Sequence, residues 1–111
     1  MAALTTTVVA LAGQRFDNLL TAANASDDAE TGAGVLLLVR TGGTITTVTL
    51  VTPETVDGDL AVADRAVVTV ATGDTMIPLT SRYRDPTTGR ATINFSPTTA
   101  VTRCVVRVPT T

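Results

Sequence analysis

The clearest strand and turn signals of the chain lie in residues 35–51. This stretch reads Val35-Leu36-Leu37-Leu38-Val39-Arg40, then Thr41-Gly42-Gly43-Thr44, then Ile45-Thr46-Thr47-Val48-Thr49-Leu50-Val51. The first segment is a continuous apolar run, short enough to be a central strand buried on both faces. The two glycines supply a turn because glycine adopts positive φ freely. The Thr and Val residues that follow are β-branched and suit a pleated, half-buried surface, so the stretch predicts a strand, a turn and a second strand.

Short strands and turns continue to the end of the chain. Further strands are predicted over residues 65–71, 76–79, 91–96 and 101–108, with turns at Asp57-Gly58 and within residues 81–90. Pro78 places its strand at an edge or a bulge, because proline cannot donate a ladder hydrogen bond. Strands of this kind predict an all-β, single-domain β-sandwich or barrel of about seven to eight short strands with an extended N-terminal arm.

Alternation along the last two strands predicts which side chains face the core. In the strand 91–96, two apolar residues point inward and two polar residues point outward: Ile93 and Phe95 against Thr92 and Asn94. In the strand 101–108, Cys104, Val106 and Val108 share one face, while Arg103, Val105 and Arg107 share the other. We therefore expect Cys104 to be a buried core residue.

The first 34 residues are less regular. Apolar residues up to Leu20 can be read at helical spacing, whereas the Thr run and Gly13 favour extended structure. We expect an extended arm or edge strand over residues 1–24, followed by a solvated acidic loop over residues 24–34. The predicted organisation is an N-terminal arm and acidic loop over 1–34 and a β-sandwich domain over 35–111.

The composition argues against catalysis and metal chemistry. The chain has no His, Lys or Trp, and Cys104 is its only cysteine. Without His, a Ser/His/Asp or Cys/His site is excluded, and zinc and copper lack their usual ligands. Asp57, Asp59 and Asp64 could hold Ca²⁺ along a loop, but Asp-Gly-Asp is also ordinary turn chemistry. We predict no enzymatic activity and no cofactor.

Charge and hydropathy limit the partners and the compartment. A formal charge of −2 and a pI near 4.8 argue against nucleic-acid binding by a basic face. No segment approaches the roughly 20 apolar residues of a membrane span, and Met1-Ala2-Ala3-Leu4 does not resemble the start of a secretory signal. We expect production in a cytoplasm, with no direct nucleic-acid partner and no membrane partner.

The best candidate for a functional surface is the loop 81–90. Arg82, Tyr83, Arg84 and Arg90 are residue types enriched at protein–protein hot spots, although a hydrophilic hairpin with its arginines paired to Asp85 would have the same composition. Arg103 and Arg107 extend the candidate protein interface onto the last strand. There they can pair with acids of a neighbouring subunit or face solvent.

Residues 48–70 carry a resemblance to a known family. A strand ending in Thr52-Pro53 leads through Val56-Asp57-Gly58 and Leu60-Ala61-Val62-Ala63-Asp64-Arg65 into the second Val/Thr strand Ala66-Val67-Val68-Thr69-Val70. This pattern resembles a family of small structural proteins of tailed bacteriophages. Tyr83, Asp85 and Gly89 resemble the family's Tyr-containing loop, and Asn94-Phe95-Ser96 resembles its aromatic-Ser strand end. The segment 76–79 departs from the family pattern, because Leu79 stands where an aromatic residue is more usual.

The resemblance implies a virion component encoded among head genes. We expect a capsid decoration or cement protein that binds the major capsid protein on the capsid surface, as a homo-oligomer or as lattice-bound copies. One alternative is a head–tail connector or tail component that forms a ring. Another is a carbohydrate- or host-binding module, for which the few aromatic side chains leave little stacking surface.

Overall fold

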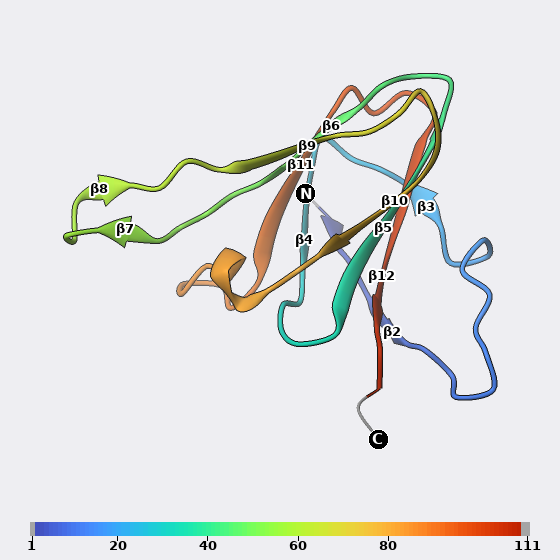
Figure 1. Cartoon of the computed structure of the whole chain (residues 1–111), viewed down its shortest axis with the longest axis horizontal. Helices are drawn as coiled ribbons and strands as arrows, with labels where there is room; N and C mark the ends of the chain where they lie inside the picture. Colours follow the sequence, from blue (N-terminus) through green and yellow to red (C-terminus); the bar gives the residue numbers. More distant parts are fainter. Residues whose placement is uncertain (1, 110–111) are drawn as a thin grey trace.

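The computed structural model describes residues 2–109 and shows two β-sheets packed face to face in a single domain (Figure 1). Among these residues, seven strands have four or more residues: β4 (Ser26–Ala29), β5 (Val35–Gly42), β6 (Thr47–Leu50), β9 (Arg65–Val68), β10 (Thr72–Pro78), β11 (Ala91–Ser96) and β12 (Val101–Arg107). The shorter strands are β1 (Ala2–Ala3), β2 (Thr6–Val8), β3 (Thr21–Ala22), β7 (Thr55–Val56) and β8 (Leu60–Ala61). The predicted all-β sandwich is confirmed, and the described strands do not close into a barrel.

The chain alternates between the two sheets. The first sheet has the order β1-β4-β11-β6-β9, and the second has the order β10-β5-β12-β2, with β3 also paired to β12. Strands β1 and β2 run parallel to β4 and β12, whereas the remaining pairs are antiparallel. The N-terminal arm is thus built of edge strands, as expected, and it contributes to both sheets.

Aliphatic side chains from both sheets fill the core. Period-two alternation sends Val35, Leu37 and Val39 of β5 inward, where they meet Ile93 and Phe95 of β11. The inward prediction for these last two residues is confirmed. Pro78 ends β10, which is the edge strand expected from a proline at this position.

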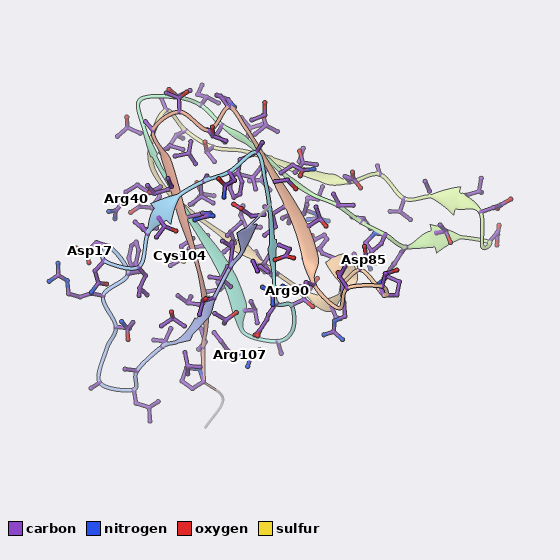
Figure 2. The ribbon with its side chains drawn as sticks, turned by 180° about the vertical axis from the view of Figure 1, so that it is seen from behind. Asp17, Arg40, Asp85, Arg90, Cys104 and Arg107 are labelled. Carbon is purple, nitrogen blue, oxygen red and sulfur yellow. The ribbon has the colours of Figure 1, made fainter. Side chains whose placement is uncertain are left out.

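Two predictions for the polar residues were wrong. The expected acidic loop contains β4, which lies between β1 and β11 and buries Asp27 completely. The two faces of β12 are also exchanged, because Val105 and Arg103 face the core whereas Cys104 lies on the opposite face. Cys104 is nevertheless buried, because residues of the N-terminal segment cover it there. Figure 2 shows Cys104 behind that segment, near Arg40 and Asp17.

Candidate protein-interaction surface

The six predicted interface residues have different environments. Arg82 and Tyr83 lie in a single 3-10 turn, η1 (Ser81–Tyr83), and Arg84 follows it. Arg90 precedes β11, and the remaining two, Arg103 and Arg107, lie on β12. Tyr83 is buried in the core cluster, whereas Arg82 and Arg84 are exposed.

Arg103 forms an ion pair inside the sandwich. Its Nε donates to Oδ2 of Asp27 at 2.9 Å, and the two residues are 3% and 0% exposed. Asn24 donates its side-chain amide to the other carboxylate oxygen at 3.1 Å, and Arg103 also donates to the hydroxyl and carbonyl oxygens of Thr21. The pair therefore links the two sheets and holds the segment that leads into β4. The sequence-based alternatives for Arg103, a neighbouring subunit or solvent, are both wrong because its partner lies in its own core.

This environment lowers the pKa of Asp27. Burial on its own raises the pKa of the carboxyl group, but the hydrogen bonds from Arg103 and Asn24 and the charge of Arg103 together outweigh burial. The carboxylate is therefore ionised in the folded protein at neutral pH.

Three other arginines of the predicted interface contact residues 28–31, which directly follow Asp27. Arg90 pairs with Asp28 at 3.2 Å and donates to the carbonyl oxygen of Leu4, which fixes the N-terminal arm. Arg107 pairs with Glu30 at 3.1 Å, and Arg84 donates to the hydroxyl of Thr31 at 3.0 Å. Residues 27–31 thus bind four arginines of the predicted interface. The alternative in which the arginines of this loop pair with Asp85 is not observed in the described part of the chain, where that carboxylate accepts the backbone N–H of Thr87.

Strands β7 and β8 form a hairpin that projects from the sandwich (Figure 1). The β6–β9 pair continues into it, with Thr55 opposite Ala61 and a further backbone bond from Val62 to Glu54. The predicted turn is confirmed: Asp57 and Gly58 both have positive φ in the loop 57–59, between the paired residues Val56 and Leu60. We call residues 53–64 the acidic hairpin, because they contain four carboxylates and no basic residue. Leu60 of this hairpin is 57% exposed.

An open groove of about 510 Å³ lies between the edge strands β9 and β10. Arg65 and Arg82 carry its charge, and Met76, which is 69% exposed, contributes apolar surface. We call this feature the basic groove, and its lining residues are Arg65, Val67, Met76, Ile77, Pro78, Thr80, Arg82 and Tyr83. The sequence analysis did not include Arg65 in the candidate interface. Its position directly after an acidic segment without basic residues could have indicated it.

The unpaired charges divide between the acidic hairpin and the basic groove. Within residues 2–109, five ion pairs use five of the eight arginines and five of the ten acids. The arginines outside these pairs are Arg65, Arg82 and Arg84, which lie in the basic groove or next to it. The acids outside them are Glu54, Asp57, Asp59, Asp64 and Asp85, of which the first four belong to the acidic hairpin. Most of the unpaired negative charge therefore lies on the acidic hairpin, and the unpaired positive charge lies in or next to the basic groove.

The three aspartates weighed as Ca²⁺ ligands have other surroundings. Asp64 accepts the backbone N–H of Thr52 at 2.9 Å, and Asp57 lies in the hairpin turn. Across the described part of the chain, no group of three His, Cys, Asp or Glu side chains is placed to hold a metal ion.

The N-terminal segment forms a second candidate surface over the outer face of the second sheet. Val9, Phe16 and Leu20 line an apolar pocket of about 390 Å³ together with residues of β5, β10 and β12. Arg40 lies 5.4 Å from the centre of the Phe16 ring and pairs with Asp74 at 2.8 Å, and this hydrogen bond lowers the pKa of Asp74. Nearby, burial raises the pKa of the Cys104 thiol, which makes it unsuited to act as a nucleophile at neutral pH.

No protein-family model, curated protein or solved structure matches this chain. Among residues 2–109, no helix is long and apolar enough to cross a membrane.

Proposed function

We propose that this protein is a non-enzymatic structural protein of a phage particle, which binds the major capsid protein on the capsid exterior and stabilises the shell. The observation that carries the proposal is the projecting ribbon β6–β7–β8–β9. It is formed by residues 47–68, and the resemblance to phage structural proteins is best over residues 48–70.

A ribbon of this kind favours a role in assembly. Two-stranded hairpins are only marginally stable in water, and they gain stability when another surface covers them. The acidic hairpin exposes Leu60 and unpaired carboxylates beyond its own sandwich, so its side chains are available to another protein. Many such contacts on a symmetric shell act together, and modest individual affinities then give substantial net stabilisation.

The copy number in purified particles tests this proposal. Quantitative mass spectrometry against the major capsid protein is expected to give one copy per capsid subunit or a simple fraction of that number. Absence from the particles, or no binding of the purified chain to capsids that lack it, would overturn the proposal.

A ring at the head–tail junction or in the tail is the second candidate. The acidic hairpin and the basic groove favour it, because two different complementary surfaces on one subunit can generate a closed ring. A ring predicts about a dozen copies or fewer per particle, whereas a shell lattice predicts on the order of hundreds. The same measurement therefore separates the two candidates.

A further inference from the structure

We propose that two copies of this chain bind each other through the acidic hairpin of one copy, docked in the basic groove of the other. This contact goes beyond the proposed role on a capsid: it assigns the acidic hairpin to a second copy of this chain, whether or not the chain binds a capsid. In the single chain the hairpin projects from the sandwich and the groove is open. The hairpin carries negative charge, and the groove carries positive charge.

The first argument is charge. The hairpin carries Glu54, Asp57 and Asp59 without ion-pair partners in the described part of the chain, and the groove carries Arg65 and Arg82 in the same condition. Five of the other six arginines form ion pairs within the described part of the chain, and the sixth, Arg84, donates to the hydroxyl of Thr31. Because complementary potentials steer association and set register, the hairpin and the groove form a matched pair of surfaces.

The second argument is apolar contact. Leu60 is 57% exposed on the hairpin, and Met76 is 69% exposed in the groove beside Val67 and Pro78. An apolar side chain rimmed by charges is typical of an interface anchor, because the rim excludes water from the contact. The edge strands β9 and β10 that border the groove also have one unpaired side each among the described strands.

The hairpin cannot reach the groove of its own chain. Only residues 62–64 connect β8 to β9, and the hairpin continues the line of the β6–β9 pair away from the sandwich (Figure 1). Folding it back would break the bond from Thr52 to Asp64 at its base. A second copy therefore supplies the hairpin. Since the groove lies at the base of the hairpin, two copies with antiparallel hairpins fill both grooves at once.

Sedimentation equilibrium of the full-length chain tests the contact directly. We expect reversible self-association that weakens as salt is added, because exposed charges are screened. Asp59→Arg on the hairpin and Arg82→Glu in the groove should each weaken association by about tenfold or more, since each replaces attraction with repulsion. The matched controls are Asp17→Arg and Arg15→Glu, which make the same charge changes in an exposed ion pair of the N-terminal segment.

Mixing the two variants is the decisive experiment. Neither variant should associate strongly alone, but an equimolar mixture of the Asp59→Arg and Arg82→Glu chains should recover the wild-type affinity, because opposite charges then meet in both contacts. Circular dichroism confirms that each variant is folded. A chain that stays monomeric at every soluble concentration at low salt would overturn the proposal. So would variants that associate like wild type, or a mixture that shows no recovery. Capsid binding is measured separately, so either proposal can fail without the other.

Discussion

Arg103 and Asp27 bring opposite charges into the interior from different sheets. Removing two charges from water is costly, and the attraction between them offsets this cost only when the remaining polar atoms are also satisfied. Asn24 and Thr21 provide those additional bonds. The pair therefore fixes the position of β4 in the first sheet relative to β12 in the second, and it makes the N-terminal segment part of the folded domain.

Breaking this pair should destabilise the protein strongly. Arg103→Ala leaves the Asp27 carboxylate buried without its main donor, and a loss of about 3–5 kcal/mol in the free energy of unfolding is expected. The double variant Arg103→Met with Asp27→Leu should lose less than the sum of the single variants, because it leaves no buried charge. Urea denaturation of the wild type, Arg103→Met, Asp27→Leu and the double variant measures the coupling, and Arg103→Ala is measured beside them. A loss below about 1 kcal/mol for Arg103→Ala would show that the pair is not buried in solution.

The same pair predicts acid sensitivity. The pKa of Asp27 is lower in the folded protein than in the unfolded chain, so its contribution is complete above the unfolded value and is lost as the pH falls through the folded value. Because the chain has no His, the free energy of unfolding should be nearly flat between about pH 5 and 8 and should fall below about pH 4.

Chemical denaturation across this range measures the acid dependence. Asp27→Asn should lower stability at neutral pH and reduce the acid slope. An unchanged slope in Asp27→Asn would contradict the assignment.

At the scale of elements, the β6–β9 ribbon has two parts with different roles. Inside the sandwich, Val48 and Leu50 of β6 are completely buried. Beyond Pro53, the described side chains of the hairpin are exposed or only half-buried, and none belongs to the core cluster. The strands continue although their packing stops, because the Asp57-Gly58 turn and the backbone bonds between β7 and β8 maintain the hairpin.

The hairpin should be dispensable for folding. Replacing residues 53–63 with an Asn-Gly turn keeps the bond from Thr52 to Asp64 and should change the free energy of unfolding by no more than about 1 kcal/mol. Leu50→Ala in the same ribbon should cost about 2–5 kcal/mol, because it opens a cavity in the core. Thermal unfolding followed by circular dichroism compares the two. Loss of cooperative unfolding on excision would mean that the hairpin is part of the folding core.

At the scale of the whole molecule, the N-terminal segment ties the two sheets together. It pairs through β1 with β4 in the first sheet and through β2 and β3 with β12 in the second, and between β2 and β3 it crosses the outer face of the second sheet. Cys104 lies under this segment and is 7% exposed, so its thiol reports whether the segment stays in place.

Loosening the segment should expose this thiol. Leu19 lines the same pocket as Cys104, and Leu19→Ala should raise the rate of thiol modification several-fold, because local opening becomes easier. Leu11→Ala removes a side chain that is 80% exposed and should leave the rate unchanged. Equal rates in all three proteins would show that the segment does not protect the thiol.

Local patterns predicted most of the sandwich. The apolar run of β5, the Thr and Val residues of β6, the alternation in β11 and the glycine turns each carry their signal within a few residues. The burial of the polar residues was harder to predict, because the sequence around an aspartate does not show whether it lies in a solvated loop or is buried beside an arginine. Asp27 and Arg103 lie far apart in the chain, and neither is apolar.

The all-β class, the positions of the central strands and the Asp57-Gly58 turn follow from local sequence, because they depend on β-branched residues, short-range alternation and local φ preferences. The tertiary structure adds that β4 joins the first sheet and that four of the five arginines of the predicted interface bind residues 27–31. It also decided which charges stay unpaired. The physical reason is that ion pairing and burial depend on which strands become neighbours, and pairing between distant strands is a property of the whole fold.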